Sequence, residues 1–132
     1  MNFPRREVVE RVKKEYPAGT RVVLKRMEDP QAPPVGTMGT VTAVDDTGSL
    51  IVSWDNGSGL NVVYGEDHAK KMIMTDKVFR QLLAVRDSGV CNMLSINEVQ
   101  RYAFDNEYFD LVCYIEDHKK EYCNFILRGT EE

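Results

Sequence analysis

The chain has 132 residues, of which 42% are hydrophobic and 29% are charged, and its formal net charge is −4. These proportions are typical of a folded globular protein and exclude a disordered or fibrous chain. No apolar run approaches the roughly 18–20 residues that cross a bilayer. The N-terminus turns charged within a few residues and lacks the apolar core of a secretory signal. We therefore expect a water-soluble, cytoplasmic protein that does not bind membranes.

The first half of the chain shows one helical segment and then a period of two. Residues 4–16 begin with a proline, which suits the first position of a helix, and carry apolar side chains at helical spacing. They predict a short amphipathic helix. Four alternating stretches follow, and these predict strands near residues 22–27, 40–44, 50–54 and 60–64. Asn56-Gly57 is a strong hairpin signal. This half therefore predicts a four- to five-stranded, SH3-like antiparallel sheet or barrel.

After Thr75, a candidate N-cap, the apolar period becomes helical. The pattern predicts three helices, the first ending at a Ser-Gly stop near residue 88. The second begins at Ser95, where Ser95 and Glu98 have the spacing of a capping box. The third covers about residues 107–125. The fold class is therefore α+β, a short helix and small sheet followed by three helices.

The change of period divides the chain into residues 1–74 and 75–132. Each half lies near the size at which a hydrophobic core alone is marginal. We therefore expect the halves to pack on each other or on a neighbouring subunit, in a homo-oligomer. Charge is also distributed unevenly. Residues 1–27 hold eight basic and three acidic residues, whereas residues 75–132 hold seven basic and eleven acidic residues.

The positions of the cysteines, histidines and carboxylates argue against a metal site and against catalysis. The chain has three cysteines and two histidines, namely Cys91, Cys113, Cys123, His68 and His118. The odd number and wide spacing of the cysteines indicate reduced thiols, and zinc ligands at paired spacing are absent. Paired carboxylates and a nucleophile with a neighbouring base are absent too. We expect no metal, no cofactor and no enzymatic activity.

Both halves resemble known modules. The barrel half does so through Gly36-Thr37-Met38-Gly39-Thr40-Val41 and Trp54-Asp55-Asn56-Gly57, and the helical half through Val99-Gln100-Arg101 and the ending at residues 121–127. These stretches resemble uncharacterised two-part proteins of phages and integrated elements of Gram-positive bacteria, an SH3-like barrel followed by a helical module. The resemblance implies a viral or mobile-element protein that works in the host cytoplasm.

In size and layout the chain also resembles the Thoeris anti-defence sponge proteins. That resemblance implies an oligomer that sequesters a cyclic ADP-ribose-type or cyclic oligonucleotide signal without cleaving it. Such a site needs aromatic faces for the base and cationic groups for the phosphates. Residues of these kinds, with asparagines among them, gather in the helical half at Phe79, Arg86, Asn92, Arg101, Tyr102, Asn106 and Arg128. Each of these residues also has an ordinary structural interpretation in the core, a cap or an ion pair.

Two other functions stay open. Trp54, Tyr64 and the proline-rich loop could form a groove for a partner protein, as in SH3-type adaptors. Trp54 is in phase with Leu50 and Val52, however, so we expect it to be buried. The basic segment at residues 5–26 could bind nucleic acid, but the chain as a whole has a pI near 5.3, which favours a solvated helix face.

Overall fold

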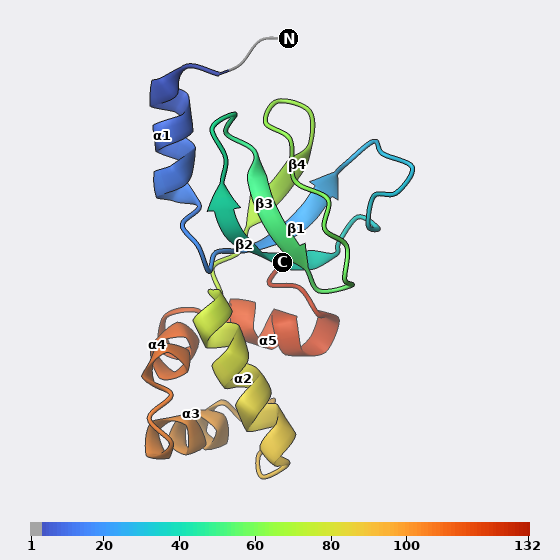
Figure 1. The fold of residues 1–132 in the computed structure, drawn as a ribbon. Helices are drawn as coiled ribbons and strands as arrows, with labels where there is room; N and C mark the ends of the chain where they lie inside the picture. Colours follow the sequence, from blue (N-terminus) through green and yellow to red (C-terminus); the bar gives the residue numbers. More distant parts are fainter. Residues whose placement is uncertain (1–3) are drawn as a thin grey trace. The chain divides into compact units, whose positions relative to one another are not determined.

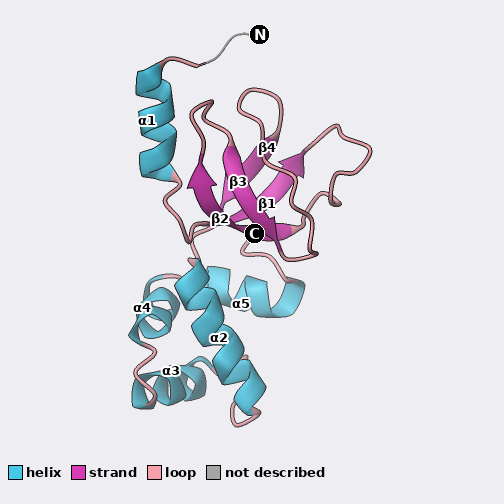
Figure 2. Cartoon of the chain, in the orientation of Figure 1, coloured by secondary structure: helices cyan, strands magenta, loops and turns pink. Residues whose placement is uncertain are grey.

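The computed structural model describes residues 4–132. The chain forms two compact units, the first reaching to Met72 and the second covering Ile73–Glu132. The helix and the sheet belong to the first unit and the remaining helices to the second, which Figures 1 and 2 show by label and by colour. The α+β class, with a short helix, a small antiparallel sheet and then helices, is confirmed.

The first unit is a four-stranded antiparallel sheet preceded by a helix. Its elements are α1 (Arg6–Glu15), β1 (Arg21–Arg26), β2 (Met38–Val44), β3 (Leu50–Trp54) and β4 (His68–Lys71). The strand order is β3-β2-β1-β4. Register shifts interrupt both the β2–β3 and the β1–β4 ladders. Such irregularities bend a sheet and increase its twist, so a small sheet can close around its own core.

Alternating apolar residues on the strands build this core. Trp54 is 2% exposed, and its indole Nε1 donates to the carbonyl of Leu60 at 2.7 Å. The predicted burial of Trp54 is therefore confirmed. Opposite it in the register is Gly39, where a Cβ would lie 2.8 Å from the Trp54 ring. The sheet can accommodate the indole because the facing position has no side chain.

The last predicted strand is only partly correct. In the 60–64 stretch the ladder is reduced to a single bridge between Leu50 and Val62. The fourth strand is instead β4, which the apolar pattern does not reveal. β4 buries Ala69 and exposes its histidine and both of its lysines. Lysines on an edge strand are a common protection against further strand pairing, and they remove the alternation that would indicate a strand.

The second unit is a group of four helices around its own core: α2 (Asp76–Ser88), α3 (Ile96–Asp105), α4 (Phe109–Asp117) and α5 (Lys119–Arg128). Thr75 caps α2 as predicted, because its hydroxyl accepts a hydrogen bond from the amide of Val78 at 3.2 Å. Gly89 ends the helix in the left-handed region, at φ 67°. The most deeply buried side chains come from all four helices and include Leu82, Val99, Leu111 and Tyr122.

Two predictions for this unit are wrong. The single helix expected over 107–125 is divided at His118, which ends α4 and precedes α5 with φ −137° and ψ 52°. Tyr114 on α4 and Tyr122 on α5 both belong to the core of this unit. The capping box is also absent, because Ser95 makes no side-chain cap hydrogen bond. In the described residues, no helix is long and apolar enough to cross a membrane.

Candidate binding site

The residues expected to bind a nucleotide lie in the second unit, and all of them except Arg101 make structural contacts there. The Phe79 ring packs edge-on against Phe125, with 6.1 Å between ring centroids. Arg86 is exposed and its guanidinium lies 3.3 Å from the carboxylate of Asp87. Phe79 and Arg86 are seven residues apart on α2, which is about 10 Å along a helix axis. Arg101 is exposed on α3.

The remaining members of the set lie at turns and helix ends. The side-chain oxygen of Asn92 accepts a hydrogen bond from the amide of Leu94 at 3.0 Å. Tyr102 is partly buried against the core, and the side-chain amide of Asn106 donates to its carbonyl at 2.9 Å. Arg128, near the chain end, donates to the carbonyl of Glu132 at 3.5 Å. A hydrogen bond therefore joins Tyr102 to Asn106, and a shared pocket for all seven residues stays a prediction.

A concave site is present in the first unit instead. A hollow of about 550 Å³ lies where the C-terminal end of α1, the start of β3 and the segment 62–69 meet. Tyr16 and Tyr64 line it from two of these segments. Tyr64 is 48% exposed, so its ring is accessible. Tyr64 belongs to the expected adaptor groove, whereas Tyr16 lies at the end of the predicted helix over residues 4–16, and its helical spacing indicates only a place on the apolar side of that helix.

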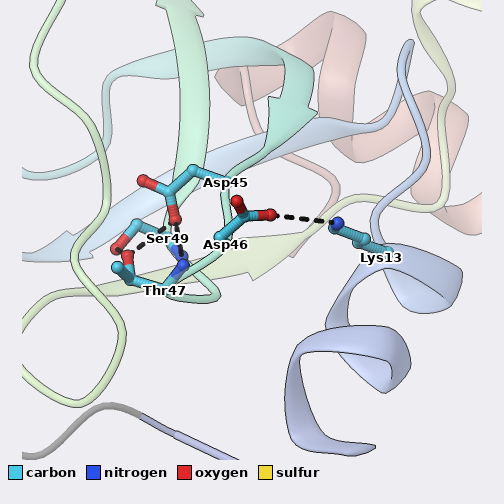
Figure 3. A network of polar contacts seen from close by, with 5 residues as sticks. All are labelled: Lys13, Asp45, Asp46, Thr47 and Ser49. Carbon is cyan, nitrogen blue, oxygen red and sulfur yellow. Dashed lines mark hydrogen bonds and ion pairs between the residues drawn. The ribbon is translucent and has the colours of Figure 1, made fainter. Parts of the chain in front are cut away.

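The turn between β2 and β3 holds Tyr64 in place. One carboxylate oxygen of Asp45 accepts three hydrogen bonds, from the amide of Thr47 at 2.9 Å, its hydroxyl at 2.6 Å and the amide of Ser49 at 3.0 Å (Figure 3). The Ser49 hydroxyl in turn accepts from the amide of Tyr64 at 3.2 Å. The turn at residues 45–49 thus fixes the backbone of a residue that lines the hollow.

Two contacts hold the end of α1 at the hollow. The Lys13 ammonium lies 3.7 Å from the carboxylate of Asp46 in the same turn (Figure 3). The Lys71 ammonium, on β4, donates to the carbonyl of Glu15 at 2.8 Å. Tyr16 also packs against the core of the first unit. These contacts connect α1 to both the turn and the edge strand, which positions Tyr16 and Glu15 at the rim.

The ionisable groups of the site differ in their surroundings. Burial alone would raise the pKa of Asp45, but hydrogen bonds from Thr47 and Ser49, together with the charge of Lys13, outweigh it and lower that pKa below its usual 3.8. Burial, with a smaller contribution from Glu15, raises the pKa of Tyr16 above 10.0. Asp45 is therefore an anionic structural group, and Tyr16 presents a neutral ring at neutral pH.

The charge of the hollow is negative. Its lining includes three carboxylates, from Glu15, Glu66 and Asp67, against the guanidinium of Arg26 and the imidazole of His68. Arg26 is already paired with a carboxylate outside this lining, that of Glu28, at 2.9 Å. Two tyrosine rings beside an excess of carboxylates suit a cation and disfavour a phosphate.

In the described part of the chain, the candidate metal ligands do not cluster and the cysteines form no disulfide. Within residues 4–132, no group of three or more histidine, cysteine, aspartate or glutamate side chains is placed to hold a metal ion. The three cysteines are free thiols. Cys113 is exposed, while Cys91 and Cys123 are partly buried. The side chains that line the hollow itself offer charge, hydrogen bonds and aromatic faces.

Comparison with protein families divides the chain at the same place as its structure. Residues 5–72 match the family described as a domain of unknown function, DUF4314. The chain belongs to this family. Residues 74–130 match a second family described in the same terms, DUF5049. No curated protein and no solved structure matches the chain. The DUF4314 match covers α1, the sheet and therefore the whole hollow, whereas the DUF5049 match covers the helices.

Proposed function

We propose that the protein is a non-enzymatic, protein-binding adaptor, and that its DUF4314 unit takes a lysine or arginine side chain of a partner protein into the hollow beside Tyr16 and Tyr64. The observation that supports this function is the lining itself, two tyrosines with three carboxylates and one guanidinium that is already paired. In this proposal the adaptor site includes Tyr64 and leaves out Trp54, which is buried.

The proposed chemistry has two components. A cation over a tyrosine face gains about 0.5–2 kcal/mol, depending on how far it is desolvated. The carboxylates of Glu15 and Glu66 are exposed, so each adds a modest, salt-sensitive attraction. Asp67 has one oxygen engaged by the amide of Val63 at 2.9 Å, which leaves its second oxygen for a ligand. A single side chain would therefore bind weakly, and affinity for a whole partner would need further contacts.

The test is an NMR titration of the full chain with blocked tripeptides. Gly-Lys-Gly and Gly-Arg-Gly should shift the amide signals of Tyr16, Tyr64 and Glu66 saturably, and Gly-Glu-Gly should not. Tyr64→Ala and Glu66→Gln should each weaken the binding several-fold. Tyr64→Phe, which keeps the ring, and Glu116→Gln, in the other unit, are the matched controls and should preserve it.

The same titration distinguishes the nucleotide-binding hypothesis. Cyclic dinucleotides, cyclic trinucleotides and cyclic ADP-ribose isomers are the appropriate probes. Saturable shifts at Phe79, Arg101 and Tyr102, with no response of the hollow to either basic peptide, would overturn the adaptor proposal and favour signal sequestration. Equal responses to the basic and the acidic peptide would also overturn it, because they would show that the carboxylates do not select the ligand.

A further inference from the structure

Two phenylalanines project into solvent at one corner of the second unit. Phe104, in the last turn of α3, is 60% exposed, and Phe109, at the start of α4, is 49% exposed. Their rings meet edge to face, with 5.6 Å between centroids and 70° between planes. We call residues 104–109 the phenylalanine corner. Paired aromatic rings at the surface are a frequent feature of protein-binding sites, since aromatic side chains supply much of the energy of interfaces.

The backbone of the corner is closely defined. The amide of Tyr108 donates to the carbonyl of Ala103 at 2.7 Å, and the amide of Glu107 donates to that of Phe104 at 3.0 Å. This is the pair of hydrogen bonds that closes a Schellman motif. Glu107 occupies the left-handed position of the motif, with φ 63°, where glycine is usual. The structure thus keeps an acidic residue between the two phenylalanines in the chain, at a backbone position that disfavours any side chain.

The surroundings of the corner are acidic. Residues 98–117 contain six acidic residues and one basic residue, Arg101. Asp110 is paired with Lys77 at 2.8 Å. Asp105 and Glu107 are exposed and, within the described residues, have no ion-pair partner. A partner surface must therefore be basic as well as able to cover two rings.

The chain itself has a surface of this kind on α1. The inner side of the helix is occupied, because Val9 is buried and Val12 packs against the core of the first unit. Three cations, Arg6, Arg11 and Lys14, line a shallow groove on the outer side together with two glutamates. None of these three cations forms an ion pair with another described residue. Their long apolar stems can lie on aromatic rings while the charges reach carboxylates.

We propose that the phenylalanine corner binds the outer side of α1 from a second copy of this chain. In this contact Arg11 and Lys14 of one copy meet Asp105 and Glu107 of the other, and their stems cover Phe104. The inference is independent of the hollow and of its ligand. It assigns a role to both the basic N-terminal segment and the acidic second half, whose opposite charges would otherwise have no shared explanation.

The test is a charge-exchange experiment on the full chain, read by sedimentation equilibrium at low salt over a wide concentration range. The wild-type protein should self-associate, and added salt should weaken the association. Arg11→Glu with Lys14→Glu should be monomeric, and so should Asp105→Lys with Glu107→Lys. A mixture of these two variants should associate again, because each new surface then meets its opposite charge. Lys119→Glu with Lys120→Glu reverses the same charge on α5 and should leave the association unchanged.

A second variant tests the rings. Phe104→Ala with Phe109→Ala should weaken self-association about thirtyfold or more, as expected of aromatic residues at the centre of an interface. Both rings are largely exposed, so circular dichroism should show the wild-type helix content.

A wild-type chain that is monomeric at every concentration would overturn the proposal. So would an oligomer that survives both charge reversals, or a mixture of the two variants that stays monomeric. The protein could instead be monomeric and bind nucleic acid in a salt-sensitive way that Arg11→Glu with Lys14→Glu abolishes. That result would overturn the proposal and assign α1 to nucleic-acid binding.

Discussion

Asp45 shows how one carboxylate can position a residue that lines a hollow without lining the hollow itself. It accepts three hydrogen bonds inside its own turn, and through Ser49 this turn holds the amide of Tyr64 (Figure 3). The turn composition of residues 45–49 predicts a turn from sequence alone. The connection from that turn to Tyr64 crosses fifteen positions of the chain from Ser49. A local rule therefore finds the turn and misses its role in the hollow.

The Asp45 pKa leads to a prediction for acid stability. The folded-state pKa lies below 3.8, so the ionised form stabilises the fold above this value, and that contribution is lost as the pH falls through the folded-state pKa. Asp45→Asn should therefore flatten the decline of the free energy of unfolding between about pH 5 and pH 2. Urea titrations at several pH values would measure it. Asp46→Asn, which removes only the ion pair to Lys13 at 3.7 Å, is the control. An Asp45→Asn curve with the wild-type slope would contradict the prediction.

Glu107 supports a second prediction at this scale. Its φ of 63° is unfavourable for a residue with a side chain and easy for glycine. Glu107→Gly should therefore raise the free energy of unfolding by roughly 0.5–1 kcal/mol. The measurement is the midpoint of guanidinium unfolding, with an unchanged m-value. If the phenylalanine corner binds a second copy, the same variant should associate less tightly, so stability and association would move in opposite directions.

At the scale of elements, the end of the chain closes the second unit. The Glu131 carboxylate accepts hydrogen bonds from the amides of Ile73 and Met74, at 2.9 and 3.0 Å, and from the hydroxyl of Tyr114 at 2.6 Å. Burial, together with this bond and the charge of Glu131, raises the pKa of Tyr114 far above 10.0, so the phenol donates throughout the physiological range. The last residues thus hold both the segment before α2 and a core residue of α4.

Glu131→Gln should destabilise the protein by roughly 1–2 kcal/mol, because the amide keeps one acceptor oxygen where the carboxylate has two. The loss should appear as a lower midpoint of thermal or urea unfolding, followed through the helical signal. Asp117→Asn removes a charge of the same sign at an exposed position at the end of α4 and should have little effect. Equal stability of the Glu131 variant and the wild type would show that water replaces these hydrogen bonds without loss.

The break at His118 shows why element boundaries were harder to predict than elements. Apolar side chains recur at helical spacing on both sides of it, and neither glycine nor proline stands at the junction. The pattern therefore predicts one helix, whereas the backbone at His118 divides the segment into two. β4 is the converse case, because a strand that buries only Ala69 has no alternating pattern to detect.

At the scale of the whole molecule, each unit has a core built from its own residues. The core of the first unit contains residues from Val22 to Ala69, and that of the second contains residues from Met74 to Tyr122. The two family matches separate at the same point in the chain, between residues 72 and 74. Division of the core in this way is the usual condition for units that fold separately.

We therefore expect residues 73–132, expressed alone, to be helical and to unfold cooperatively, with a stability of a few kcal/mol at this size. Circular dichroism against urea would measure it, and residues 1–72 provide the companion sample. A fragment of residues 73–132 that is unfolded alone and regains helicity on mixing with residues 1–72 would contradict this expectation. That outcome would instead support the mutual dependence that the small size of the two halves suggests.

The sequence by itself determined the fold class, the change from a period of two to a helical period near residue 75, the burial of Trp54 and the N-cap at Thr75. These features follow from local spacing and local hydrogen bonds, which neighbouring residues specify directly. Only the tertiary structure decided which polar and aromatic groups share a site. Tyr16 and Tyr64 line the same hollow although 48 positions separate them. Of the seven residues expected to bind a nucleotide, Arg101 is exposed within α3, and the others lie at core, turn or helix-end positions. Contacts between distant positions depend on how the elements pack, and periodicity contains no information about that.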